Sequence, residues 1–148
     1  MDFFSALLLY IFISVIKFIF PFIGTLFLFA CKQSVISQSF SSADSLVLHF
    51  KDEAAGIVTK TVETTEIAAI KKIVSFLDAA KTENFQCGYD GKMFFYHRGQ
   101  QVQEVDFQMK DTACRHFSFL IDEKLVSTKM DDEAVTFLDH IEKGMAGY

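Results

Sequence analysis

The sequence lacks the signals of a nucleic-acid binder and of the common hydrolases. It has no long run of Lys or Arg, and its formal net charge is −5. A net acidic chain does not attract a phosphate backbone, so we expect no nucleic-acid partner. The sequence also contains neither a G-x-S-x-G nucleophile motif nor an H-E-x-x-H zinc motif. We therefore expect no enzyme activity and no cofactor.

Charge is almost absent from the beginning of the chain. Residues 3–30 carry one charged side chain, that of Lys17, and eight of the 18 Phe. Residues 31–148 carry 13 of the 14 basic and 18 of the 19 acidic residues, which gives 13 − 18 = −5, and they contain no proline. This division predicts an apolar head followed by a single small domain.

The apolar head supports two interpretations. Read as one span, its roughly 28 residues are enough to cross a bilayer. Lys17 would then lie near the middle of the span, at a cost of about 2.5–3.5 kcal/mol, and Pro21 would break the helix. Read as an export signal, a Lys precedes an apolar stretch that ends in a small residue. We favour the export signal, and an uncleaved single-pass membrane subunit remains the alternative.

Residues 28–31, Leu-Phe-Ala-Cys, resemble a bacterial lipobox. The resemblance implies that residues 1–30 are a lipoprotein signal peptide and that Cys31 is lipidated and becomes the first residue of the mature chain. The lipid anchor would attach the protein to a membrane of the bacterial cell envelope. Lys32 is not the Asp that typically retains lipoproteins in the inner membrane, so we expect the outer membrane rather than the inner one.

Two segments next to this signal need their own explanation. A compact signal would begin at Val15, so residues 1–14 are consistent with a mis-annotated start. Residues 32–45 are polar and rich in Ser, which is typical of a flexible linker. We therefore predict that residues 31–45 form the lipidated Cys and a tether, and that the domain covers residues 46–148.

The pattern within residues 46–148 predicts the order β-α-β-β-β-β-α. Strands are expected at 46–50, at 93–97, after the turn at 98–100, at 114–121 and at 125–129, while residues 51–61 are ambiguous. A helix of about sixteen residues, capped by Thr64 or Thr65, follows the first strand, and Asp131 caps a final helix that Gly144 ends. The fold class is α+β, with an antiparallel sheet of about five strands and both helices on one face.

Two local irregularities are expected in the strands. Val102 is out of phase with the inward-facing Val105 and Phe107, which predicts a β-bulge near Gln103. Asp90-Gly91 is a strong turn signal, so we expect a turn there.

The three cysteines give the clearest chemical prediction. If Cys31 carries lipid, Cys87 and Cys114 remain as a pair in an oxidising compartment, which favours a disulfide. A metal or redox site formed by Cys87, Cys114, His97 and His116 is the alternative, although structural zinc sites usually space their cysteines more closely. We expect both histidines to face outward from their strands as ordinary polar residues.

Aromatic residues are dense around the second predicted strand. Phe94 and Tyr96 alternate with Phe95, and Tyr89 lies just before the strand. One face of this strand must pack on the helices. We expect Tyr89, Phe94 and Tyr96 on the other face to contact either a partner or a covering loop.

The domain resembles the small α+β lipoproteins of unknown function in Gram-negative bacteria. The residues that carry this resemblance are Cys87–Lys92, Cys114 and Phe117-Ser118-Phe119. The resemblance implies no particular activity. Together these observations predict a membrane-anchored, non-enzymatic binding or accessory module of the bacterial cell envelope that acts on a protein partner.

Overall fold

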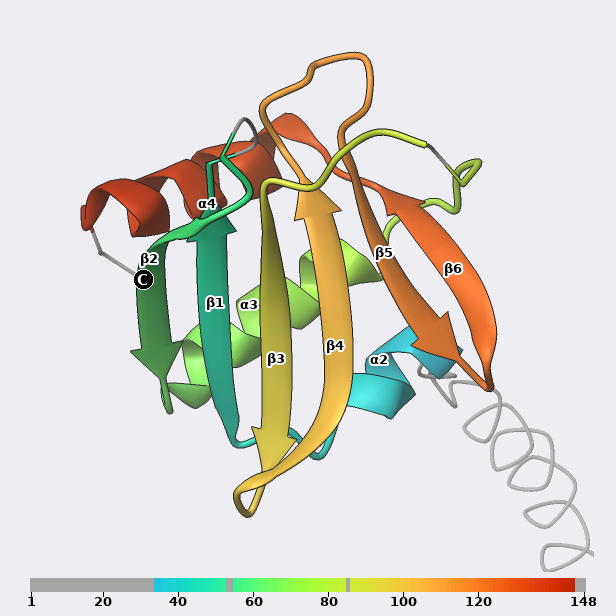
Figure 1. The fold of residues 1–148 in the computed structure, drawn as a ribbon. Coiled ribbons are helices and arrows are strands. Elements are labelled where there is room, and N and C mark those ends of the chain that lie inside the picture. Colours follow the sequence, from blue (N-terminus) through green and yellow to red (C-terminus); the bar gives the residue numbers. More distant parts are fainter. Residues whose placement is uncertain (1–33, 53–54, 85, 146–148) are drawn as a thin grey trace, which may run out of the picture. The chain divides into compact units, whose positions relative to one another are not determined.

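A computed structural model describes residues 34–52, 55–84 and 86–145. These residues belong to one unit, Gln33–Tyr148. The chain order is shown in Figure 1. The elements are α2 (Val35–Phe40), β1 (Ser45–Lys51), β2 (Val58–Thr64), α3 (Ile67–Leu77), β3 (Gly91–His97), β4 (Gln100–Gln108), β5 (His116–Ile121), β6 (Lys124–Lys129) and α4 (Asp132–Lys143).

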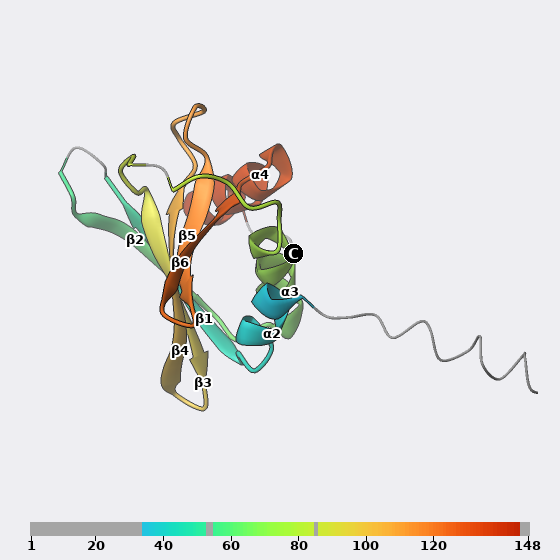
Figure 2. The ribbon, with the colours of Figure 1, turned by 90° about the vertical axis from the view of Figure 1, so that its right-hand side faces the viewer.

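The strands form one antiparallel sheet in the order β2-β1-β3-β4-β5-β6. The three helices lie on one side of this sheet, and no described helix covers the other side (Figure 2). The predicted α+β class is therefore confirmed. The described residues contain six strands and three helices, whereas about five strands and two helices were predicted.

The core lies between the sheet and the helix layer, and strand alternation selects its residues. In β3, Met93 and Phe95 are fully buried while their neighbours are only partly buried. Phe95 packs edge-to-face against Phe40 of α2, with 4.8 Å between ring centroids. Phe50 of β1 packs in the same way against Phe107 of β4 at 5.6 Å. Such aromatic pairs add stabilisation beyond the area that they bury.

The prediction of a flexible tether is wrong for residues 35–40, which form α2. The Ser34 hydroxyl caps this helix by accepting from the backbone N–H of Ser37, and both serine hydroxyls donate to the Asp78 carboxylate at the end of α3. Phe40 is 1% exposed and belongs to the core. The Ser-rich composition was misleading because two of these hydroxyls cap a short helix and join it to α3.

Strand β2 occupies the segment whose structure the sequence left ambiguous. Its exposed and partly buried residues alternate weakly because it lies at the sheet edge, where β1 is the one described strand that pairs with it. The pairing skips Thr59, which marks a bulge where Phe50 faces Lys60 and Lys51 faces Val58.

Other local predictions are confirmed. The β3–β4 pairing skips Val102, so the bulge lies next to Gln103 as expected. Asp131 caps α4 by accepting from the Ala134 N–H, and Gly144 ends the helix with a φ of 73°. That left-handed conformation is the one for which glycine has no steric penalty.

Two local predictions are wrong. Helix α3 is shorter than expected: its 11 residues run from Ile67, with Glu66 as the N-cap, to Leu77. The Thr64 hydroxyl accepts from the Glu66 N–H before the helix begins. Asp90-Gly91 is not a hairpin turn but the beginning of β3. A Cβ at Gly91 would lie 2.3 Å from the His49 carbonyl oxygen, so this glycine is required by close packing.

Candidate functional site

The side of the sheet that no described helix covers, here called the open face, carries most of the candidate binding residues. Because Met93 and Phe95 point into the core, the intervening residues of β3 point to the open face. The strand register then aligns Phe94 with Val47 of β1 and with Glu104 of β4. The open face is therefore a continuous surface across β1, β3 and β4.

The structure brings two of the three predicted aromatic residues to the open face. Phe94 and Tyr96 are both partly buried there. The Phe94 ring meets the His49 ring edge-on, with 5.1 Å between centroids, so neighbouring side chains hold it in place. A rigid aromatic ring of this kind is a common anchor at protein interfaces.

A charged cluster lies beside these rings. The Lys92 ammonium is 3.0 Å from the Asp106 carboxylate and also contacts Glu104. Partial burial lowers the pKa of Lys92, but its hydrogen bonds to Glu104 and Asp106 outweigh that effect and leave the pKa above its usual value. One ammonium faces two carboxylates, so the cluster keeps a net negative charge.

An apolar pair that was not predicted from the sequence lies on the same face. Leu120 and Leu125 are cross-strand partners on β5 and β6 and are 54% and 51% exposed. A shallow hollow of about 260 Å³ lies beside them and extends to Glu104 and Asp106. The sequence did contain a signal for this pair. Leu120 is out of phase with the inward-facing Phe117, Phe119 and Ile121, so its side chain points to the opposite face of the sheet.

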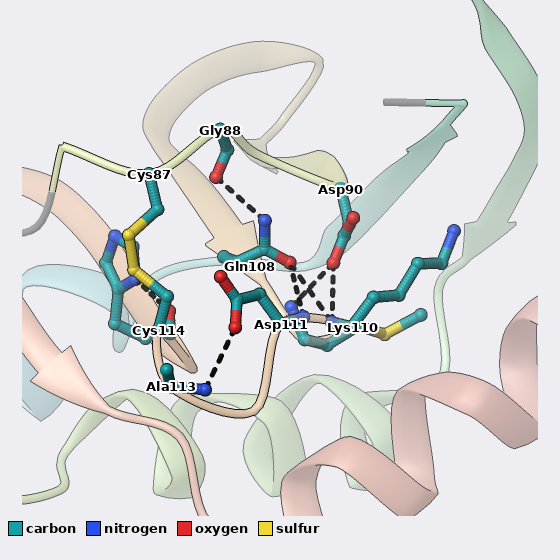
Figure 3. Close-up of a disulfide and its surroundings, with 10 residues drawn as sticks. Cys87, Gly88, Asp90, Gln108, Lys110, Asp111, Ala113 and Cys114 are labelled. Atoms are coloured by element: carbon teal, nitrogen blue, oxygen red, sulfur yellow. Dashed lines mark hydrogen bonds between the residues drawn. A yellow bond between two sulfur atoms is a disulfide. The ribbon is translucent and has the colours of Figure 1, made fainter. Parts of the chain in front are cut away.

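Cys87 and Cys114 form a disulfide, with 6.5 Å between their Cα atoms. Figure 3 shows the hydrogen bonds around it. The Gln108 side-chain amide donates to the Gly88 carbonyl, and the Asp90 carboxylate accepts from the backbone N–H groups of Met109 and Lys110. The disulfide and these bonds join the segment before β3 to the β4–β5 loop.

The prediction that His116 faces solvent is wrong, because its side chain is fully buried. The centroids of the His116 and Tyr89 rings are 5.7 Å apart, and the His116 Nδ1 is 2.6 Å from the Cys114 carbonyl oxygen. Tyr89 therefore packs on His116 at one end of the open face, as part of the loop that covers that end.

The proposed set of two cysteines and two histidines is not assembled. His97 lies at the end of β3, whereas Cys87 precedes the beginning of that strand. Seven strand residues separate these positions by roughly 20 Å. Among the described residues, Asp111 is the residue that brings a possible metal ligand close to the two sulfurs. Its carboxylate lies within 4.8 Å of both sulfur atoms. The sulfurs are bonded to each other, so they are not thiolate ligands in this form.

His97 instead pairs with a carboxylate that the sequence analysis did not select. Its Nδ1 lies 3.3 Å from Asp44, and the Arg98 backbone N–H donates to the same carboxylate at 2.8 Å. The Arg98 N–H is the main cause that lowers the pKa of Asp44; the Ser45 hydroxyl and the His97 charge add to it.

A cleft of about 500 Å³ opens next to this pair, between α2 and α3. Its apolar wall includes Phe40, Ile70 and Val74, and several serines lie at its rim. None of these residues was predicted as a site, because the cleft depends on the docking of α2.

Several predictions concern residues outside the described part of the chain. These are the signal peptide over 1–30, the start at Val15 and lipidation at Cys31. Within residues 34–52, 55–84 and 86–145, no helix has the length and apolar character needed to cross a membrane. The comparisons with known proteins give no match to a family model, a curated protein or a solved structure.

Proposed function

We propose that this protein is a lipid-anchored, non-enzymatic module of the bacterial cell envelope that binds a protein partner through its open face. The observation that carries the proposal is the arrangement of that face. Aromatic side chains on β3 and an exposed leucine pair on β5 and β6 lie on either side of an acidic cluster. Rigid aromatic anchors are enriched at partner-binding surfaces, and a charged cluster beside them adds selectivity for the partner.

The charge of the face indicates the chemistry of the partner. Glu104 and Asp106 contribute two negative charges, and Lys92 neutralises one of them. A partner segment that complements this surface would have a basic side chain to pair with the acidic cluster and apolar side chains on either side to contact the aromatic residues and the leucines. Such complementarity directs association and discriminates between partners more than it raises affinity.

The proposed anchor would hold this domain close to the membrane. Cys31 lies three residues before Ser34, and Ser34 is fixed to Asp78 of α3. Three extended residues span about 10 Å. A lipid on Cys31 would therefore keep the domain near the bilayer surface, as suits a module that meets other envelope proteins. In the alternative, an uncleaved head would give a single-pass subunit with the same open face.

A photo-crosslinking experiment tests the binding surface. A photoreactive amino acid replaces Leu120 on the open face of the full chain in its native membrane, and the control carries it at Thr136, an exposed position of α4. We expect a discrete adduct from position 120 only. Adding Phe94→Ala should reduce its yield at least severalfold, since a buried aromatic anchor contributes strongly to binding.

Two results would contradict the proposal. Equal adducts from positions 120 and 136 would show that contact is unspecific. An adduct whose yield is unchanged by Phe94→Ala would place the contact outside the aromatic part of the open face.

A further inference from the structure

The two edges of the sheet differ in whether another segment of the described chain pairs with them. At the β6 edge, Thr82 N–H donates to the Ser127 carbonyl and Lys129 N–H donates to the Ala80 carbonyl, each at 2.9 Å, and Lys81 forms a bridge with Thr128. The segment before β3 thus covers that edge. No described residue pairs with the outer edge of β2. An uncovered edge strand offers unpaired backbone donors and acceptors to another strand.

Apart from the bulge at Thr59, the usual protections of an edge strand are weak in β2. The strand contains neither Pro nor Gly. Its one lysine, Lys60, is directed away from the edge, because its ammonium donates to the carbonyls of Ile141 and Glu142 at the end of α4, at 3.1 and 2.5 Å. Its charge is therefore bound to a helix terminus and does not repel an approaching strand.

The hydrogen-bond alternation shows which backbone groups of β2 are free. In an antiparallel sheet each residue directs its N–H and C=O to the same side, and consecutive residues alternate. The Lys51 N–H donates to the Asp90 carbonyl at 2.7 Å, so the odd-numbered residues of β1 bond toward β3 and the even-numbered ones toward β2. The inward-bonding residues of β2 are therefore the partners of those even-numbered residues, Lys60, Val62 and Thr64.

Thr61 and Glu63 then direct their backbone groups outward. The bulge at Thr59 ends the regular part of the strand on one side, and Thr64 ends it on the other. Val62 is the centre of the regular stretch, and its side chain packs against the core on the helix side.

From this geometry we infer that β2 pairs with β2 of a second copy of the chain, antiparallel and with Val62 facing Val62. In this register Thr61 of each copy faces Glu63 of the other, and both pairs are of the hydrogen-bonded type. Lys60 faces Thr64, so no two like charges are opposed. Two β-branched valines meet on the helix side, a favourable cross-strand pair.

A second copy of the chain is the partner that the edge of β2 fits best. Under a twofold axis, the free backbone groups and the side chains of one β2 strand complement those of the other. The pairing would join two sheets into one, with both open faces on the same side. It leaves the open face free for the proposed partner and does not depend on that proposal or on the lipid anchor.

Cysteine crosslinking of the full chain in its native membrane tests the register. Copies carrying Thr61→Cys and copies carrying Glu63→Cys are expressed together with different tags and then oxidised. Facing residues of a hydrogen-bonded pair have Cα atoms about 5.5 Å apart, which a disulfide can bridge. We expect mixed disulfide dimers well above the level of wild-type chains, and fewer dimers from either variant expressed alone.

A matched pair of charge changes tests the same contact without cysteines. Thr61→Lys places an ammonium opposite Glu63 of the other copy and should strengthen association, whereas Thr61→Glu should weaken it. The effect acts at two symmetric pairs, so we expect changes of about two- to thirtyfold in the dimerisation constant in mild detergent. The thermal unfolding of both variants shows that the monomer fold is kept.

The inference is overturned if mixed dimers do not exceed the wild-type background. It is also overturned if the two charge variants dimerise equally. A disulfide that joins Thr61→Cys to a different protein, with no dimer, would assign the edge to a foreign strand instead of a second copy.

Discussion

At the scale of single residues, neighbouring positions of β3 have opposite roles. Phe95 is fully buried and packs against Phe40, whereas Phe94 lies on the open face against His49. The chain thus places a core residue and a candidate binding residue side by side through strand alternation alone.

This difference gives the first prediction. Phe95→Ala should lower the free energy of unfolding by about 3–5 kcal/mol, because it empties a packed core site. Phe94→Ala should cost roughly 1 kcal/mol or less and act mainly on partner contact. Urea denaturation of the two variants measures both values. Equal losses of stability would show that Phe94 belongs to the core and not to a binding face.

Asp44 gives a prediction on pH. The pKa of its carboxyl is lowered in the folded protein, so the charged form stabilises the fold. This stabilisation is present above the usual value of 3.8 and is lost as the pH falls through the lower, folded-state pKa. Asp44→Asn should therefore unfold at a lower temperature than wild type at pH 7, and the difference should shrink as the pH falls below 3.8 and through the lowered pKa. A difference that stays constant with pH would contradict this role.

The sequence predicts residue roles well where the cause is local. Asp131 and Gly144 act as expected because helix caps depend on the residue and its immediate neighbours. The burial of His116 could not be predicted, because the loop that carries Tyr89 covers it from outside its own strand.

At the scale of elements, α2 changes the extent of the domain. Its six residues are too few to give a clear amphipathic pattern, and its stability comes from contacts with α3 and the sheet. Strand β2 was also left ambiguous by the sequence. It is an edge strand with one paired side, so its buried and exposed residues alternate only weakly. Strands β3 to β5 were predictable because alternating apolar residues of each are buried in the core, and β6 followed from the hairpin turn before it.

The third prediction concerns α2. Phe40→Ala should lower the free energy of unfolding by about 3–5 kcal/mol, since this ring touches both Phe95 and Phe119. Val35→Ala on the same helix is the control, because Val35 is 63% exposed and should cost no more than about 0.5 kcal/mol. If neither substitution changes the denaturation midpoint, residues 34–45 are a tether after all.

The fourth prediction concerns the disulfide as a connection between two loops. Replacing both Cys87 and Cys114 by Ala opens a loop with a sequence separation of 27, which should cost about 3–4 kcal/mol in the chain-entropy model. Denaturation of the double variant beside the oxidised wild type measures the loss. A loss below about 1 kcal/mol would mean that the Asp90 and Gln108 hydrogen bonds hold the loops without it.

At the scale of the whole molecule, the proposal joins three features. An apolar head ends at Cys31, a disulfide closes the domain, and an open sheet face is left for a partner. The fold class followed from the order of strand and helix patterns. The open face did not, because it depends on how all six strands align and on where the helices and the covering loop lie.

The central claim is that the protein is a disulfide-containing domain held to a membrane by a lipid on Cys31. The intact mass of the native, membrane-extracted protein, taken before and after reduction, tests it most directly. We predict a chain that begins at Cys31 and carries acyl groups, with two hydrogen atoms gained on reduction of the disulfide between Cys87 and Cys114. A mass that retains residues 1–30 without lipid would contradict the anchor and favour the single-pass subunit, and an unchanged mass on reduction would contradict the disulfide.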